Sequence, residues 1–435
     1  MGTIESKLSY LLRTKEEIRN AINGKGVKVT EQDTFRSYAD KIRAIVGTEY
    51  YVPSLTPEAV NFKDYDGGVL HTYTKDEFLA LTEMPALPSR PRLVCQGWNW
   101  NLEDAKAYVQ EYGRLDIGAT YITDDGKTRF YIKVEGERKS FPFKFSIDKA
   151  NSLTIDWGDG FSEAVSGSGS LNVSHTYDSV GDYVVSLEVA DGAKLTIGSS
   201  SSEEFVNRPY SIMLGKVEVG ERTIIGINAF YYCSSLSSVV IPNSVTSIGH
   251  QAFQYCYSLS SVVIPNSVTS IGYQAFYSCS SLSSVVIPNS VTSIDSSAFQ
   301  YCSSLSSVVI PNSVKSIGQS TFYQCYSLSS VVIPNSVKSI DSSAFYYCSS
   351  LSSVVIPNSV TSIGSQAFQG CYSAYFDFRT HTSVPTLASY IAFSNIPSDC
   401  KIVVPDELYN SWISATNWSN TNVAKYIVKA SEFNG

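Results

Sequence analysis

The sequence predicts a multidomain protein whose larger part is a solenoid of 23-residue units. Three observations predict this architecture. A 23-residue unit repeats almost unchanged over residues 230–368, short and regular strands with Asp-Gly turns precede it, and residues 1–47 show helical periodicity. In chain order we expect an N-terminal helical hairpin, a small α+β module, a β-sandwich, the solenoid and a C-terminal cap.

Shifts in pattern along the chain place the boundaries between these parts. We expect a helical attachment or oligomerisation segment at 1–47, the α+β module at 48–137, the β-sandwich at 138–199, the solenoid at 200–375 and its cap at 376–435. The length of 435 residues allows this number of domains.

The repeat can be followed by one phenylalanine and one cysteine that recur in every unit. The string SLSSVVIPNSV recurs six times between them. The repeated residues are Phe230, Phe253, Phe276, Phe299, Phe322, Phe345 and Phe368, with Cys233, Cys256, Cys279, Cys302, Cys325, Cys348 and Cys371. A fixed period of this size is typical of a solenoid, whose units bury their apolar faces by stacking on one another.

Within one unit the apolar spacing predicts a short strand and a turn. Leu236, Val239 and Ile241 point inward, and the Pro-Asn pair that follows ends the strand. A second inward pair comes next, and we expect the coil to close at Phe253 and Cys256 on a short helical or 3₁₀ turn. Parallel stacking at about 4.8 Å per coil makes seven coils roughly 30 Å long.

The unit pattern AFxxCxSLxxVxIPxxVxxIG resembles the BspA-like class of leucine-rich repeat. The resemblance implies a parallel-strand solenoid used for adhesion, with no chemistry of its own. KIVVPDELYNSWISATNWSNT at 401–421 looks like the stretch that closes such arrays, and an atypical end unit is what a solenoid needs to cover its last coil.

The chain has nine cysteines, seven of them in the repeat. Stacked cysteines of adjacent coils point the same way, which is poor disulfide geometry, and no CxxC or HxxxH pair suggests zinc. We therefore expect buried, reduced thiols that pack as small apolar groups. Cys95 and Cys400 stand outside the array, and their state stays open.

Residues 1–47 read as two helices. Thr14 and Glu17 form a capping box before the first helix, an Asn-Gly stretch at 23–26 ends it, and Asp33 caps the second. RTKEEIRNAINGKGVKVTEQDTFRSYADKIRAI resembles a segment near the start of bacteriophage tail and fibre proteins. That resemblance implies the virion-attached end of such a protein.

The 48–137 module alternates strand signals with one helix over 102–112. Its GWNW cluster at 97–100 suits either stacking on sugar rings or buried aromatic packing, and packing is favoured. The block is similar to a small module that accompanies tail proteins and surface repeat proteins.

Residues 138–199 carry WGDG at 157–160 and HTY at 175–177. They resemble the PKD domain, an immunoglobulin-type β-sandwich, which implies spacing or protein contact. Asp156, Asp159 and His175 suggest catalysis or calcium binding on one reading, and turn formation with a tyrosine-anchored strand corner on the other. The second reading is favoured.

Neither motifs nor charge point to catalysis. With four histidines the chain has no HExxH, GxSxG or phosphate-binding loop, and residues 229–373 contain only Asp295, Lys315, Lys338 and Asp341 as charged residues. Distant carboxylate pairs are harder to exclude. We expect no cofactor, metal or catalytic residue.

Composition also argues against two classes of partner. The net charge of −8 and the absence of a basic run disfavour nucleic acid. The sequence contains no stretch of 18 apolar residues that would indicate membrane insertion, and the start of the chain lacks the pattern of a secretory signal.

Two surfaces of the solenoid are candidates for binding. One edge has the Tyr, Ser and Gln mixture of antibody paratopes, and stacked tyrosines that only stabilise the rod are the alternative. Its tyrosines are Tyr231, Tyr232, Tyr255, Tyr257, Tyr277, Tyr301, Tyr323, Tyr326, Tyr346, Tyr347 and Tyr372. A second, apolar stripe should face outward and meet another subunit, the preceding domain or a ligand. It comprises Val240, Val263, Val286, Val309, Val332 and Val355.

These features predict a non-enzymatic adhesin. The leading hypothesis is a bacteriophage tail-associated receptor-binding protein in the extracellular virion, which contacts a bacterial cell-surface receptor, glycan or protein, and other virion tail proteins. A homo-oligomer is expected, with a trimer inferred by analogy. The alternatives are a bacterial BspA-like adhesin on the cell surface and a structural tail component without receptor binding; an enzyme degrading surface polysaccharide ranks below them.

Overall fold

A computed structural model describes residues 59–198, 208–373 and 375–433. All of them belong to one compact unit, Glu58–Gly435. The helical hairpin predicted for 1–47 lies outside the described residues.

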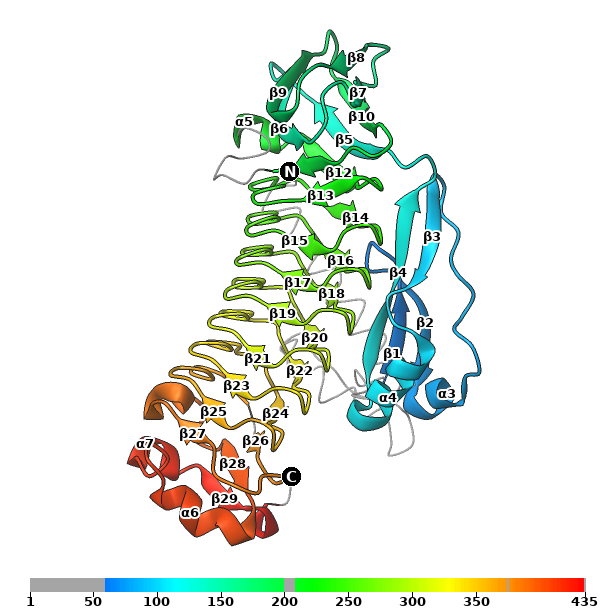
Figure 1. The fold of residues 1–435 in the computed structure, drawn as a ribbon. Helices are drawn as coiled ribbons and strands as arrows, with labels where there is room; N and C mark the ends of the chain where they lie inside the picture. The colour runs from blue at the N-terminus through cyan, green and yellow to red at the C-terminus, as the bar shows by residue number, and fades with distance from the viewer. Residues whose placement is uncertain (1–58, 199–207, 374, 434–435) are drawn as a thin grey trace, which may run out of the picture. The chain divides into compact units, whose positions relative to one another are not determined.

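The α+β module is a four-stranded sheet with two helices beside it (Figure 1). The sheet order is β2-β1-β4-β3, with β1 and β4 parallel. The helix predicted over 102–112 is confirmed: Asn101 caps its start and Gly113, with φ of 76°, ends it. The elements are β1 (Ala59–Lys63), β2 (Val69–Thr74), α3 (Lys75–Ala80), β3 (Leu93–Trp98), α4 (Leu102–Tyr112) and β4 (Leu115–Thr123).

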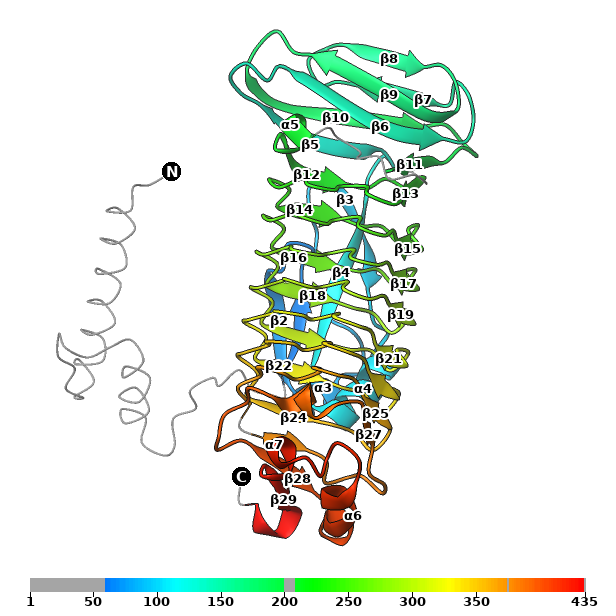
Figure 2. The same cartoon turned by 90° about the vertical axis from the view of Figure 1, so that its left-hand side faces the viewer.

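Two sheets packed face to face follow the module, and both continue into the solenoid (Figures 1 and 2). Phe143 packs on Phe130 and Trp157 between them. One sheet has the order β14-β12-β5-β10-β7-β8 and the other β19-β17-β15-β13-β11-β6-β9. The strands are β5 (Thr128–Val134), β6 (Ser140–Ile147), β7 (Leu153–Asp156), β8 (Ser162–Val165), β9 (Gly169–Thr176), β10 (Gly181–Val189) and β11 (Leu195–Ile197). The sandwich therefore covers the first open coil.

One strand belongs to a different domain from the one that the predicted domain boundary assigns it to. β5 pairs with β10 of the sandwich and with β12 (Leu214–Glu218) of the solenoid, although the boundary at 137/138 assigns it to the module. The Asp-Gly turn at Asp125 and Gly126 is typical of a hairpin. The two strands that it joins nevertheless lie in different sheets.

Each repeat contributes a three-residue strand and a two-residue strand, both parallel to those of the next coil. The pairing step equals the repeat, as in Val262 with Val285. The longer strands are β14 (Ser238–Val240), β16 (Ser261–Val263), β18 (Ser284–Val286), β20 (Ser307–Val309), β22 (Ser330–Val332) and β24 (Ser353–Val355). The shorter ones are β15 (Ser247–Ile248), β17 (Ser270–Ile271), β19 (Ser293–Ile294), β21 (Ser316–Ile317), β23 (Ser339–Ile340) and β25 (Ser362–Ile363), preceded by β13 (Thr223–Ile225) and the short helix α5 (Arg208–Ser211).

The third side of each coil is a turn with left-handed residues, where a helical or 3₁₀ turn was expected. The residue two before each phenylalanine and the residue two after it both have positive φ, as in Gln274 and Ser278. This backbone lets the N–H groups point along the solenoid axis. Phe276 donates to the carbonyl of Ala298 at 2.8 Å, and Ser278 donates to that of Gln300 at 2.8 Å.

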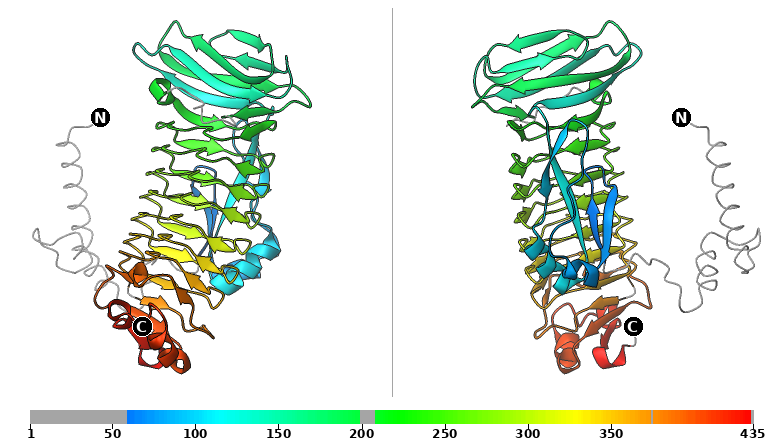
Figure 3. Two further views of the ribbon diagram at one scale, coloured as in Figure 1. Left: turned by 60° about the vertical axis from the view of Figure 1, so that its left-hand side comes forward. Right: turned by 90° about the vertical axis from the view of Figure 1, so that its right-hand side faces the viewer.

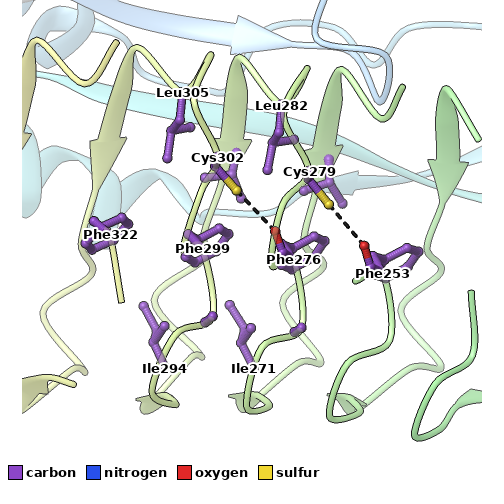
Figure 4. Packing of buried hydrophobic residues seen from close by; sticks show 14 of the residues in the cluster. Phe253, Ile271, Phe276, Cys279, Leu282, Ile294, Phe299, Cys302, Leu305 and Phe322 are labelled. Carbon is purple, nitrogen blue, oxygen red and sulfur yellow. Dashed lines mark hydrogen bonds between the residues drawn. The ribbon is translucent and has the colours of Figure 1, made fainter. Parts of the chain in front are cut away.

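A column of phenylalanines and cysteines runs through the centre of the solenoid (Figure 4). The rings of Phe276 and Phe299 are stacked, with centroids 5.3 Å apart and an angle of 1° between their planes. The Sγ–H group of Cys302 donates to the carbonyl of Phe276 at 3.2 Å, and the same bond recurs from coil to coil. Each coil is thus held to its neighbour through side chains and backbone.

The expected state of the repeat cysteines is confirmed: they are free thiols buried in the core. Burial raises the pKa of the Cys256 thiol well above its ordinary value. Cys400 is also buried in this core, where burial raises its pKa to about 12. Cys95 is only partly buried.

Residues assigned to the cap begin as further coils. Phe376 pairs with Val354, and Ile402 pairs with Phe376, so the parallel sheet continues beyond the regular repeat. Trp412 and Trp418 are fully buried and pack on each other. The last residues of the chain, red in Figure 3, close this end of the array. The elements are β26 (Tyr375–Asp377), β27 (Thr386–Leu387), η1 (Tyr390–Phe393), β28 (Lys401–Val404), η2 (Asp406–Leu408), α6 (Tyr409–Ser414), α7 (Thr421–Ala424), β29 (Ile427–Lys429) and η3 (Ala430–Glu432).

The left-handed turn residues predict an unusual effect of glycine. Ser278 has φ of 57°, a conformation that disfavours residues with a Cβ atom. We expect Ser278→Gly to stabilise the fold by up to about 1 kcal/mol, because glycine adopts this conformation without steric cost. Ser280→Gly, outside the left-handed region, should destabilise it. Urea unfolding followed by circular dichroism measures both, and a loss of stability in Ser278→Gly contradicts the prediction.

Thiol labelling should separate Cys95 from the other eight cysteines. The thiolate is the reactive form, and burial raises the pKa of Cys95. We therefore expect slow alkylation of Cys95 in the native protein, faster as pH rises, and protection of the buried thiols until unfolding. Mass spectrometry after iodoacetamide treatment measures this. Native-state labelling of any repeat cysteine would contradict it.

Candidate functional site

The apolar stripe on the longer strands lies mostly under another part of the chain. Val240, Val263, Val286 and Val309 are buried, Val332 is half-buried, and Val355 is 55% exposed. Their side chains point away from the solenoid core, and Val240 and Val309 belong to the core of the α+β module. The α+β module, which precedes the β-sandwich in the chain, covers this part of the stripe.

Strand β4 of the module crosses the solenoid strands at close range (Figure 3). A Cβ atom on Gly118 would lie 2.4 Å from Cγ1 of Val263, so only glycine fits at this position. Burying a valine side chain contributes roughly 1.5 kcal/mol or more. The stripe therefore holds the module against the solenoid.

Polar contacts bind the module to successive coils. Asn99 donates to the carbonyl of Ile264 at 3.0 Å, and Tyr108 donates to that of Ile310 at 2.9 Å. Lys63 donates to Ser284 at 2.7 Å. Further contacts join Gln96 to Asn243, Tyr112 to Asn312 and Asn335, and Arg114 to Ser330. Sequence reasoning missed these module residues.

The tyrosine edge contains a continuous ladder of rings. Ring centroids of neighbouring tyrosines lie 4.3 to 5.5 Å apart along it. We call it the tyrosine ladder; it comprises Tyr231, Tyr232, Tyr255, Tyr277, Tyr301, Tyr323, Tyr346 and Tyr347, all half-buried. It ends at Gly370, where a Cβ atom would lie 2.9 Å from the ring of Tyr347.

Variation between units preserves this ladder. The first six units carry a tyrosine at one or both of the two positions after the phenylalanine. Where one position is Ser or Gln, the other is Tyr, as in Tyr277 with Ser278 and Tyr323 with Gln324. This complementarity favours packing between coils as the role of these tyrosines.

Three tyrosines stand outside the ladder and are more exposed. Tyr257, Tyr326 and Tyr372 are 40%, 44% and 58% exposed, and each directly follows a repeat cysteine. We call them the outer tyrosines. Other units carry Ser280, Ser303 or Ser349 at this position, among others.

The edge is electrically neutral at physiological pH. Burial, together with the neighbouring rings of Tyr301 and Tyr255, raises the pKa of Tyr277 to about 12. Burial and other tyrosines likewise raise the pKa of Tyr257 and Tyr326. These three phenols therefore remain protonated, and the edge presents aromatic rings and hydroxyl groups without charged side chains.

The two motifs in the earlier domains serve structure. Trp98 and Trp100 are buried, so the GWNW cluster is packing. Asp156 and Asp159 accept turn hydrogen bonds from Gly158 and Phe161. His175 lies between the rings of Trp157 and Phe161, with its Nε2 atom 2.6 Å from Asp159 Oδ2, and Tyr177 donates to the carbonyl of Trp157 at 2.9 Å.

The described residues offer little for chemistry. They contain no group of three or more His, Cys, Asp and Glu side chains arranged to hold a metal. A shallow hollow of about 430 Å³ lies beside β23, β25 and β27, with Asp341 as its charged lining residue. None of the helices over the described ranges has the length and apolar character to cross a bilayer.

Stacked parallel coils, each closed by the same Phe and Cys residues, define a leucine-rich repeat solenoid. Residues 223–351 and 315–432 match the family described as the BspA type leucine rich repeat region, which has six copies here. The repeat region of this protein is therefore of BspA type, as its unit pattern predicted. No curated protein matches the sequence.

Several solved structures are similar to part of the chain. A leucine-rich cell surface protein from Faecalibacterium prausnitzii is 33% identical over 44% of this chain and 52% of its own, with a TM-score of 0.38. A leucine-rich repeat protein from Bacteroides ovatus is 25% identical over 53% and 61%, with a TM-score of 0.38. The Treponema pallidum leucine-rich repeat protein is 31% identical over 46% and 87%, with a TM-score of 0.30. The chain thus spans less than two thirds of the first two.

The contact between Gly118 and Val263 predicts a compensating pair of substitutions. Gly118→Ala should destabilise the docked module by roughly 1–3 kcal/mol, because its Cβ atom has no room. Adding Val263→Ala removes the clashing methyl groups and should restore part of that loss. Unfolding free energies of the single and double variants measure this coupling. Purely additive losses would contradict direct packing of the two residues.

Proposed function

We propose that this protein is a non-enzymatic adhesin whose solenoid edge binds a bacterial surface. The observation that supports it is the uncharged aromatic edge: the apolar stripe is mostly covered by the module, whereas the outer tyrosines are exposed. Exposed tyrosines and serines are well suited to binding, since tyrosine supplies rigid contact area and serine supplies adaptable hydrogen bonds.

The remaining parts of the chain fit a display role. The sandwich, whose Tyr177 anchors the backbone at Trp157, resembles a PKD domain, and we propose that it spaces and caps the solenoid. A BspA-type leucine-rich repeat solenoid is typically non-enzymatic. We extend that property to the whole chain.

We propose the virion tail as the location, with the bacterial surface as the alternative. The tail assignment rests on the resemblance of residues 13–45 to tail and fibre proteins, which implies attachment to other virion proteins. We propose a homo-oligomer by analogy with such proteins. The BspA-type repeat is equally consistent with a cell-surface adhesin. Immunogold labelling with an antibody against the solenoid separates the two: label on tails supports the first, and label on uninfected cells supports the second.

Cell binding should depend on the outer tyrosines. We expect labelled protein to bind bacteria of a recognised strain, and the triple variant Tyr257→Ser, Tyr326→Ser, Tyr372→Ser to lose about tenfold or more in affinity, as aromatic interface residues commonly do. Flow cytometry measures the bound protein. The substitutions reproduce the serine found at this position in other units, so the fold should be retained.

A matched control is available within the array. Tyr273 is 44% exposed and stands at a different repeat position, where the next unit has Ser296. Tyr273→Ser should leave cell binding unchanged. If the triple variant binds cells as well as the native protein does, the solenoid edge is not the binding surface. If the native protein binds no strain, the protein is not an adhesin.

A further inference from the structure

We propose that the outer tyrosines and the serines between them bind an extended, neutral glycan that lies along the solenoid axis. This inference rests on the proposed adhesin function and names the class of its ligand.

The row combines exposed rings with hydroxyl groups. Tyr257, Ser280, Ser303, Tyr326 and Ser349 occupy one repeat position in successive units, and Tyr372 continues the row. Aromatic rings pack against the apolar C–H faces of sugars, while serine hydroxyl groups can donate to or accept from sugar hydroxyl groups. The Ser303 hydroxyl donates to the carbonyl of Ser280 at 3.3 Å, so its oxygen remains available as an acceptor.

The tyrosine ladder supports Tyr257, one of the outer tyrosines, from below. The ring of Tyr257 lies 5.9 Å from that of Tyr255 and 6.4 Å from that of Tyr232, measured between centroids. A ring held by such neighbours loses less conformational freedom when a ligand binds, which favours affinity.

The spacing of the row matches a polymer of sugar rings. Tyr257 and Tyr326 are three coils apart, and Tyr326 and Tyr372 are two coils apart. At a rise of about 4.8 Å per coil these intervals are roughly 14 and 10 Å. Each ring of an extended glycan advances the chain by a distance similar to the rise of one coil, so sugar rings can reach successive tyrosines of the row.

Charge favours a neutral ligand. The outer-row position carries Tyr or Ser in every unit, and residues 229–373 contain only Lys315 and Lys338 as Lys or Arg residues, both at another repeat position. An anionic polysaccharide would find no cation facing these rings to offset the loss of its hydration.

The backbone of the edge leaves little for an extended peptide to pair with. Tyr255 donates its N–H to the carbonyl of Tyr277 at 2.9 Å, and Tyr301 donates to that of Tyr323 at 2.8 Å. The coils therefore use these groups on one another. Strand addition, the general mode by which a sheet edge captures a peptide, needs such groups to be unpaired.

The test uses the full-length chain and cells that it binds. Polysaccharide released from those cells is separated on an anion exchanger into neutral and anionic fractions, and each fraction competes with whole cells for labelled protein. We expect the neutral fraction alone to compete, and the triple variant Tyr257→Ser, Tyr326→Ser, Tyr372→Ser to bind that fraction about tenfold or more weakly. Tyr273→Ser should bind it as the native protein does.

Each other result has a defined meaning. Competition by the anionic fraction alone overturns the neutral-ligand inference. Cell binding that survives periodate oxidation of glycans but not protease treatment overturns the glycan inference and leaves the adhesin proposal standing. Binding of the neutral fraction that is equal in the triple variant and the native protein removes the outer tyrosines from the site. Absence of any cell binding defeats the proposed function itself.

Discussion

Stacking of the repeated phenylalanines is the interaction on which the rest of the structure depends. The rings of Phe276 and Phe299 lie nearly parallel, and the thiol of Cys302 binds the carbonyl of Phe276. Each coil therefore takes the same position relative to the preceding one. Residues at a fixed place in the repeat then form a continuous row along the solenoid, and the tyrosine ladder, the apolar stripe and the outer row all follow from this one constraint.

The repeat can be predicted from the sequence because every unit places each residue in the same environment. The spacing of Phe and Cys alone is therefore enough to identify each coil. The ends of the array are harder to predict. β5 joins the sandwich through pairing with β10 and β12, which are distant in sequence, while the turn at Gly126 suggests a local hairpin. Beyond the repeat, the parallel sheet continues through pairs such as Val354 with Phe376, although these partners are no longer separated by one 23-residue repeat.

The contact between module and solenoid shows the limit of pattern reasoning. A valine that points outward gives the same sequence pattern whether a neighbouring domain, a second copy of the chain or a ligand covers it. The solenoid residues that hold the module, such as Ser284 and Asn312, are identical in other units, so variation does not mark them. One signal was present: Gly118 lies in the middle of strand β4, where glycine often indicates the close approach of another chain segment.

The two kinds of variation at the tyrosine edge carry different information. At the ladder positions, a unit that lacks Tyr at one of the two sites has Tyr at the other, as at Tyr301 beside Gln300. The variation therefore keeps a tyrosine ring in the ladder at each of the first six units. At the position of Tyr257 no such exchange occurs. Phe276 and Phe299, whose units carry Ser280 and Ser303 at that position, are stacked with centroids 5.3 Å apart. Coil packing therefore does not require a ring there. The outer row, in which three exposed tyrosines share one repeat position, is therefore the part of the edge where we propose that recognition occurs.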